Sequence, residues 1–255
     1  MLKFFTGLIL LLFTSSSFAC VESKNKLFLS KIHWVTEDYP PYNYLDESGR
    51  LVGAVPEILA MIYGELSIKK RGNNIILLPW ARLIMYMERY PDYAAFSMVT
   101  TLERAKKFKL VPLPITTKIS ILALTSNIDT LQNKAIDELT VAVVRGDIGQ
   151  KLLNIQENPA QQVETTSAIS MLEMLLRKRV DAIAYSEDVT YYQLKKLGVE
   201  TSTVSSLYLL KDDSDVNFVF HKDASNCVID LFTKKLEVLN ESGKLLPVWK
   251  KYIQD

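Results

Sequence analysis

Tyrosines and prolines are concentrated in one loop near the start of the chain, residues 36–45. The loop follows a short apolar run, 32–35, which predicts a β-strand, and it contains the adjacent residues Pro40 and Pro41. Because two prolines fix two φ angles and remove two backbone donors, the segment can continue neither a strand nor a helix. Three tyrosines on such a stiff loop offer an aromatic surface with polar tips. This pattern predicts a small-molecule site at the carboxyl end of a strand in an α/β sheet.

Arg104, in the polar stretch 101–107, is a second candidate. A guanidinium presents a planar fork of donors that matches a carboxylate, so one arginine can both hold and orient an acidic ligand. With Glu103, Lys106 and Lys107 beside it, Arg104 could instead be a solvated surface charge. We favour the role in binding.

Other chemistries have little support in the sequence. The chain of 255 residues has two histidines, His33 and His221, which lie far apart along the chain. It lacks a Cys-x-x-Cys pair, a nucleophile elbow and a glycine-rich phosphate loop. We therefore expect no metal, no cofactor and no catalytic residue, and a protein that is not an enzyme.

The first 19 residues have the layout of a secretory signal, with a basic Lys3, an apolar run over 4–13 and a small, polar end. The apolar run is too short to span a bilayer, and Ser17-Phe18-Ala19 fits cleavage before Cys20. We expect an exported, soluble, periplasmic protein. Removing Lys3 with this segment leaves bases and acids in balance, which argues against a nucleic-acid partner.

Two cysteines remain after the expected cleavage, Cys20 and Cys227. In an oxidising compartment an even count permits a disulfide between them. Cys20 could instead carry a lipid anchor, although Ser17 stands where such a signal usually has a leucine-like residue. Both could also be free thiols, with Cys227 buried in a helix. The sequence leaves these three possibilities open.

Strand and helix patterns alternate along the chain, which is typical of an α/β fold with largely parallel sheets. Apolar residues at helical spacing predict helices within 55–66, 80–87, 169–176 and 228–239. Apolar runs predict strands at 94–99, 119–124, 140–144, 180–185 and 216–221.

Five segments, in the same order, resemble those of the bacterial periplasmic solute-binding proteins of family 3, which bind amino acids and similar polar solutes. They are the tyrosine loop with Gly53, the stretch 101–108 (similar to a Thr-Pro-Glu-Arg signature), 141–146, 179–183 and 240–245. The resemblance covers nearly the whole chain after residue 19. It implies the periplasmic binding protein type II fold, with two mixed sheets flanked by helices and joined by two hinge crossings.

Pattern and resemblance together place the crossings near 116–118 and 217–221. Lobe 1 is then expected at 28–117 plus 219–255, and lobe 2 at 118–218. The ligand would lie in the cleft between the lobes.

The resemblance also implies site residues in lobe 1. It assigns Arg104 to the α-carboxylate of the ligand, Tyr39 to the aromatic cover and Trp80 to a second wall. Ser97, near the end of its strand, would let backbone or hydroxyl groups approach the ligand. Trp80 also completes an apolar helical stripe, so core packing is an equal reading.

Lobe 2 departs from the family pattern. Asp147 stands where family members usually have threonine or serine; when ionised it offers no donor and repels a carboxylate, although it could cap the following helix. The acid that pairs with a ligand ammonium aligns with Ser186, and a shift of one residue would place Glu187 in that role; without the shift the amine partner is absent. These changes argue against a standard α-amino-acid site. They favour a ligand with one acidic end and a cationic or neutral far end, such as a peptide fragment, an opine or a polyamine-like solute.

The resemblance implies a monomer that captures a small polar, carboxylate-bearing solute, an amino acid or related compound, and delivers it to an ABC-type membrane transporter. One alternative is a periplasmic enzyme resembling cyclohexadienyl dehydratases, in which Glu187 or Asp147 acts as an acid or base if burial raises its pKa. Another is a ligand-sensing module for a membrane receptor.

Overall fold

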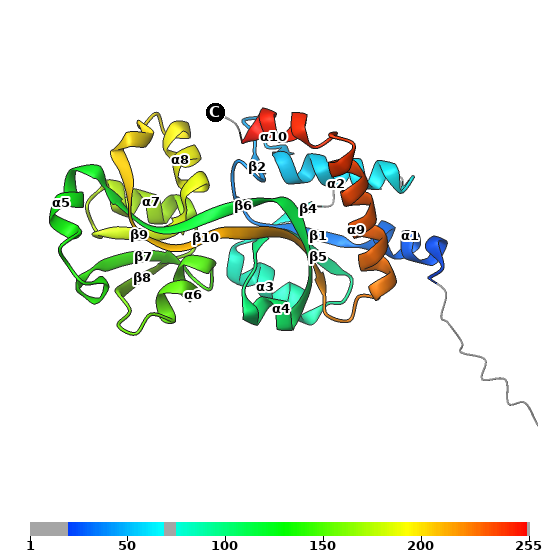
Figure 1. The fold of residues 1–255 in the computed structure, drawn as a ribbon, viewed down its shortest axis with the longest axis horizontal. Coiled ribbons are helices and arrows are strands. Elements are labelled where there is room, and N and C mark those ends of the chain that lie inside the picture. The colour runs from blue at the N-terminus through cyan, green and yellow to red at the C-terminus, as the bar shows by residue number, and fades with distance from the viewer. Residues whose placement is uncertain (1–19, 69–74, 254–255) are drawn as a thin grey trace, which may run out of the picture.

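The computed structural model describes residues 20–68 and 75–253 (Figure 1). The predicted secretory signal, 1–19, lies outside the described residues and stays a prediction. Figure 1 shows two lobes side by side, linked by two long strands, β6 (Phe108–Leu124) and β10 (Val204–His221).

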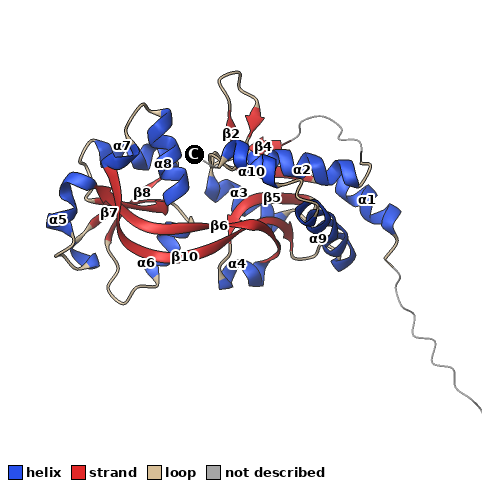
Figure 2. Ribbon diagram, turned by 45° about the horizontal axis from the view of Figure 1, so that its top comes forward, coloured by secondary structure: helices blue, strands red, loops and turns tan. Residues whose placement is uncertain are grey.

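Lobe 1 is built on a short parallel sheet that helices cover on both faces. Its strands are β1 (His33–Thr36), β4 (Ile75–Leu77) and β5 (Tyr93–Val99), and a small hairpin is formed by β2 (Tyr44–Leu45) and β3 (Leu51–Val52). Its helices are α1 (Glu22–Lys31), α2 (Ala54–Glu65), α3 (Trp80–Arg89), α4 (Leu102–Lys107), α9 (Asn226–Glu241) and α10 (Leu246–Tyr252). Helices α2, α9 and α10 cover one face, and α3 and α4 lie on the other (Figures 1 and 2).

Lobe 2 repeats this plan with fewer elements. Its strands are β7 (Thr140–Val144), β8 (Gln161–Thr165) and β9 (Ala182–Ser186). Its helices are α5 (Ile128–Leu131), α6 (Ile148–Asn154), α7 (Ala168–Leu176) and α8 (Glu187–Lys196), with short 3-10 turns at Thr125–Asn127, Ile136–Glu138 and Thr201–Thr203. Helices α7 and α8 lie on one face of the strands and α6 on the other (Figure 2).

One mixed sheet of eight strands runs through both lobes, in the order β4-β1-β5-β10-β6-β9-β7-β8. Strands β6 and β10 are antiparallel and paired from Val204–Leu124 to His221–Phe108. The lobe 1 end of β10 also pairs with β5, and the lobe 2 end of β6 pairs with β9. The α/β fold expected from the sequence is confirmed. The two expected sheets are continuous with one another because the crossing strands are long enough to belong to both. Where each lobe begins and ends along these strands stays a prediction.

An aromatic cluster holds lobe 1 together around the buried Trp34 of β1. Phenylalanines from β5, β10 and α9 pack on its indole, with ring centroids 5.6–6.0 Å away; they are Phe96, Phe218, Phe220 and Phe232. The indole nitrogen donates to the hydroxyl of Tyr63 at 2.8 Å, so the one polar atom of this ring is satisfied. Burial of such large rings is the main stabilising contribution to a small lobe.

A disulfide joins Cys20 to Cys227, at the start of α9, with 5.4 Å between their Cα atoms. It fixes the segment before α1 to the C-terminal part of lobe 1, and it selects one of the three fates that the sequence left open for these cysteines. None of the helices in the described part of the chain has the length and apolar character that a membrane crossing requires.

Candidate ligand-binding site

The candidate site lies where two strands from each lobe end at the gap between the lobes. In lobe 1, β1 leads to Tyr39 and β5 leads to Arg104. In lobe 2, β7 leads to Asp147, and β9 ends in Tyr185 and Ser186. Because the carboxyl ends of these strands face the same gap, side chains distant in sequence meet there.

Arg104 is buried, with 2% of its surface exposed. The side chain of Thr101 accepts a hydrogen bond from the Arg104 backbone N–H at 3.1 Å and so begins helix α4, which places the guanidinium in the gap. There Nη1 donates to the carbonyl oxygen of Val99 at 2.8 Å, and the guanidinium lies 4.6 Å from the centre of the Trp80 ring. Arg104 is therefore an interior charge and not a solvated one.

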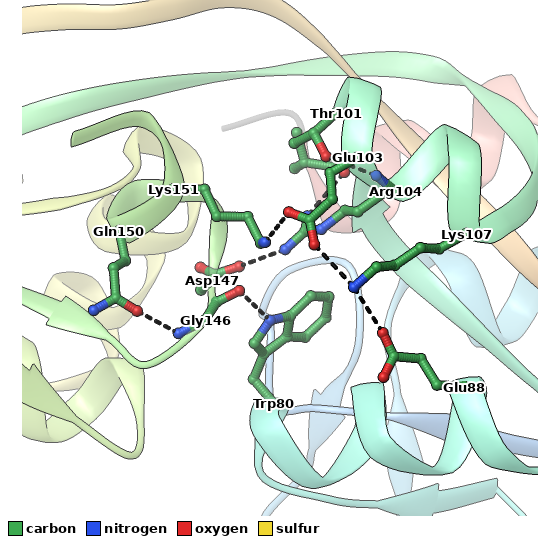
Figure 3. Close-up of polar contacts among 11 residues, drawn as sticks. Trp80, Glu88, Thr101, Glu103, Arg104, Lys107, Gly146, Asp147, Gln150 and Lys151 are labelled. Atoms are coloured by element: carbon green, nitrogen blue, oxygen red, sulfur yellow. Dashed lines mark hydrogen bonds and ion pairs between the residues drawn. The ribbon is translucent and has the colours of Figure 1, made fainter. Parts of the chain in front are cut away.

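Asp147 of lobe 2 lies opposite this guanidinium, with its Oδ1 3.7 Å from Arg104 Nη2 (Figure 3). Both side chains are at least 95% buried. Asp147 holds the N-cap position of α6, but its side chain accepts no capping hydrogen bond. The capping role considered from the sequence therefore does not account for this carboxylate.

Several buried polar atoms around this pair have no hydrogen-bond partner among the described residues. They are Arg104 Nε and Nη2, Asp147 Oδ2, Tyr39 Oη and Tyr185 Oη. The rings of Tyr39 and Tyr185 meet edge to face, with centroids 5.7 Å apart. An unsatisfied buried polar atom costs about 1–3 kcal/mol, so five of them in one place need an explanation. A bound polar ligand that completes their hydrogen bonds would provide one.

Glu37, which directly follows β1, adds a second carboxyl group to this region and is half-buried. Burial raises the pKa of Glu37 well above its usual range; the nearby Asp147 carboxylate raises it further, and Arg104 opposes the shift. Burial also raises the pKa of Asp147, against the attraction of Arg104, and lowers the pKa of Arg104. Tyr39, Tyr185, Glu37, Arg104 and Asp147 are hereafter the cleft cluster.

A cavity of about 250 Å³ adjoins the cleft cluster at Glu37. Lobe 1 contributes Glu37 and Asp38 to its lining, together with apolar residues before α3. Lobe 2 contributes Gln193 and the turn that begins α7, with its hydroxyl groups. The cavity is smaller than the roughly 300–1,000 Å³ typical of drug-sized ligands, so it suits a small solute.

Trp80 connects the lobes as well as packing in one of them. It is buried as part of the apolar stripe of α3, and its Nε1 donates to the carbonyl oxygen of Gly146 in lobe 2 at 2.8 Å (Figure 3). Gly146 has a φ of +72°, a backbone conformation that glycine adopts without strain. The core-packing reading of Trp80 is therefore present in the structure, and its role as a wall of the ligand site stays a prediction.

An exposed ion pair also bridges the lobes, and two more connect it to α3 within lobe 1. Glu103 of α4 contacts Lys151 of α6 and, within its own lobe, Lys107 at 3.0 Å (Figure 3). Lys107 continues to Glu88 of α3 at 3.0 Å. These side chains are about one-third to one-half exposed, so their pairs contribute little to stability individually.

The other predicted site residues lie near the cleft, with their polar atoms already bonded within the protein. Ser97 sits at a bulge in β5 with a φ of +61°, and its hydroxyl donates to Asn43 Oδ1. Ser186 begins α8 by accepting from Val189 N, and it shares a hydrogen bond of 2.8 Å with Thr117. Their direct contact with a ligand stays a prediction.

Glu187, predicted as an acid facing the ligand, accepts a hydrogen bond from Ser120 of the crossing strand β6. Its neighbour Asp188 accepts from Tyr42 of lobe 1 at 3.0 Å and from Thr117 at 2.9 Å. These two carboxylates therefore brace the crossing region, beside the cleft cluster.

Two members of the cleft cluster were not predicted from the sequence. Glu37 follows closely after the first predicted strand, 32–35. Tyr185 is the last residue of another predicted strand, 180–185. Position at the carboxyl end of a strand was thus the signal available for both. Within the described part of the chain no three potential metal ligands come together.

A two-lobed α/β protein with polar groups from both lobes converging on the gap between them has the architecture of a binding protein for small solutes. The chain belongs to the bacterial extracellular solute-binding proteins, family 3, whose model matches residues 32–255. The family expected from the sequence is thereby confirmed. No curated protein sequence matches the chain.

Solved structures share this fold over most of their length. An amino acid ABC transporter substrate-binding protein from Streptococcus pneumoniae, bound to L-arginine, has 18% identity and a TM-score of 0.74 over 90% of this chain and 96% of that one. A solute receptor for L-cysteine of Neisseria gonorrhoeae has 13% identity and a TM-score of 0.75 over 90% and 92%. A histidine kinase sensor domain with similarity to periplasmic binding proteins has 14% identity and a TM-score of 0.71 over 88% and 96%. At such identities the likeness concerns the fold alone.

Proposed function

We propose that this protein captures a small polar organic solute, an amino acid or a related nitrogen compound, in the cleft between its lobes and delivers it to an ABC-type membrane transporter. The observation that carries the proposal is the set of buried, unpartnered polar atoms in the cleft cluster. They come from both lobes, so a ligand that bonds to them favours the arrangement in which the lobes are in contact. Substrate-binding proteins of amino acid transporters among the structural neighbours support the same role.

Lobe closure is the conformational change that a membrane partner would recognise. Tyr39, Trp80 and Arg104 belong to lobe 1, so a ligand can dock there first. Closing then brings Asp147 and Gly146 over the ligand and forms the contact between Trp80 and Gly146. Only this arrangement presents one continuous surface from both lobes, which a transporter can distinguish from the open form.

The disulfide and the family support an exported protein that acts in the periplasm, with residues 1–19 as its secretory signal. The dehydratase alternative would need an acid or base with a raised pKa together with a histidine in the cleft. Burial does raise the pKa of Asp147, but the two histidines lie elsewhere. His33 begins β1, whose opposite end leads to the site, and His221 ends β10 beside the carbonyl oxygen of Glu88. Neither histidine belongs to the cleft cluster.

A sensory role is the second candidate, because a histidine kinase sensor domain shares the fold over nearly the whole chain. Both roles use the same cleft and the same closure. They differ in the partner that recognises the closed form, so solute uptake by cells that lack this protein separates them: transport predicts loss of uptake, and sensing predicts uptake that is intact while a response to the solute is lost.

A thermal-shift screen over amino acids, amines, peptides, organic acids and sugars tests capture itself. A ligand present at about 100 times its Kd adds roughly 2.7 kcal/mol to the free energy of unfolding, which raises the melting temperature by several degrees. If the ligand-free protein is open in solution, a ligand of the cleft must also reduce its radius of gyration in solution scattering. If the ligand-free protein is already closed, the radius must stay unchanged. If no solute class raises the melting temperature, the proposed function is wrong.

A further inference from the structure

Arg104 already has a carboxylate in front of it, supplied by the protein. Asp147 Oδ1 lies 3.7 Å from Arg104 Nη2. The carbonyl oxygen of Val99 accepts a hydrogen bond from Nη1, and the Trp80 ring covers one face of the guanidinium. A separation of 3.7 Å leaves no room for a ligand carboxylate between Arg104 and Asp147. Nε and Nη2 have no hydrogen-bond partner among the described residues, but a ligand carboxylate that approached them from another side would lie beside the buried Asp147, where like charges repel strongly.

The charges around the cleft point to a cation. Asp147, Glu37 and Asp38 provide three carboxyl groups near Arg104. Two lysines also act on them: Lys196 on Asp38, and Lys151, which is itself paired with Glu103, on Asp147. Among the described residues that line the cavity of about 250 Å³ there are two carboxyl groups and no lysine, arginine or histidine. Burial together with the Asp147 carboxylate raises the pKa of Glu37, and an arriving cation would relieve the same repulsion.

Three of the five unpartnered atoms suit an ammonium or guanidinium group, whereas Arg104 Nε and Nη2 are donors and need an acceptor instead. Asp147 Oδ2 accepts only, and the hydroxyl oxygens of Tyr39 and Tyr185 can accept from N–H donors. The same two rings, set edge to face, offer an aromatic surface to a positive charge. All three side chains are at least 95% buried, so a cation held there would be well shielded from water.

We propose that the cleft selects a small organic amine without a carboxylate, because Asp147 takes the place of the ligand carboxylate at Arg104. The amine or guanidine nitrogen binds between Glu37 and Asp147 Oδ2, against Tyr39 and Tyr185, and the rest of a short chain extends into the cavity beside Glu37. This inference rests on the proposed function and narrows the class of solute within it.

Matched pairs of compounds that differ by one carboxylate test the inference directly by calorimetry. Agmatine is compared with arginine, putrescine with ornithine, and cadaverine with lysine. In at least one pair the amine is expected to bind ten times more tightly than its amino acid, or better. If every amino acid that binds does so as tightly as its amine, Asp147 does not exclude the carboxylate and the inference is overturned.

Changing Asp147→Thr gives the protein the hydroxyl group that family members usually carry at this position. The ratio of amine to amino-acid affinity is expected to fall at least tenfold, with the amino acid gaining affinity. Asp92→Asn, which removes an exposed carboxylate at the opposite end of lobe 1, serves as the control and should leave the ratio unchanged. If the ratio of amine to amino-acid affinity is unchanged in Asp147→Thr, the inference is wrong. If that variant fails to fold, Asp147→Asn, of nearly identical shape, takes its place with the same expectation.

The two proposals fail in different ways. If amines and amino acids both leave the melting temperature unchanged while a sugar or an organic acid raises it, the amine inference is wrong and the capture of a solute stands. If no class of compound has any effect, both are wrong.

Discussion

The hydrogen bond between Trp80 and Gly146 gives the sharpest test of lobe closure. Trp80→Phe keeps an aromatic ring over Arg104 and in the stripe of α3 but removes the indole N–H that donates across the gap at 2.8 Å. In the open form both groups can bond to water, so the loss falls on the closed form. A neutral hydrogen bond contributes about 0.5–1.5 kcal/mol net, which corresponds to a Kd increase of about 2- to 13-fold.

Trp34→Phe is a matched control within the same lobe. Its indole N–H donates to Tyr63 Oη at the same distance of 2.8 Å, but in the core of lobe 1 and away from the cleft. We expect Trp34→Phe to lower the melting temperature without changing the Kd. Trp80→Phe should raise the Kd and shift the ligand-free protein toward the larger radius of gyration of an open form.

Calorimetry with a ligand found in the thermal-shift screen, and solution scattering of the ligand-free protein, provide the two readouts. The reasoning is refuted if Trp80→Phe lowers only the melting temperature, as Trp34→Phe is expected to do, and leaves both the Kd and the radius of gyration unchanged. Trp80 would then be a core residue whose contact with Gly146 does not influence closure.

Three further outcomes follow from the structure. Burial raises the pKa of Glu37 above 4.5. The affinity for a cationic ligand should therefore be highest above this raised pKa, where Glu37 is ionised. It should decline as the pH falls through the raised pKa, at a higher pH than for an ordinary glutamate. Glu37→Gln should remove this pH dependence from the calorimetric Kd and stabilise the ligand-free protein at neutral pH; a Kd that varies with pH as before would exclude Glu37. Cys20→Ser should cost about 2–5 kcal/mol in denaturant unfolding, and adding a reductant should lower the stability of the wild type but not of the variant. Gly149→Ala should destabilise by about 1–3 kcal/mol, because a Cβ would lie 1.9 Å from the carbonyl oxygen of Ala184. Gly64→Ala, in open space on α2, should be neutral or stabilise by up to about 1 kcal/mol, and equal effects of the two glycine changes in thermal unfolding would contradict this.

The sequence was most informative about individual helices and strands, and least informative about which strands and side chains contact each other. Alternating strand and helix patterns and the five ordered segments were enough for the fold class and the family, since apolar periodicity depends on residues near one another along the chain. The predicted helices and strands that frame the cleft are present, with ends that differ by a few residues. The joining of two expected sheets into one was not readable, because it depends on the pairing of strands about 100 residues apart.

The candidate site divides in the same way. Tyr39, Trp80 and Arg104 were proposed from the stiff loop, the short signature and the family resemblance. The structure brings all three close to Asp147 or to one another. Ser97, Ser186 and Glu187 have the expected polar character, yet their bonds go to Asn43, Thr117 and Ser120. Partner choice of this kind is set by which elements pack against each other, and a local pattern does not encode it.

From the sequence alone, local patterns of apolar, turn and charged residues determined the α/β class and the chemical types that surround the cleft, and the resemblance of five ordered segments indicated the family and its two-lobed fold. Only the tertiary structure decided that Asp147 faces Arg104, that Glu37 and Tyr185 belong to the same cluster, and that Cys20 pairs with Cys227. Burial and charge pairing are properties of groups meeting across the gap between the lobes, so they exist only once the chain has folded.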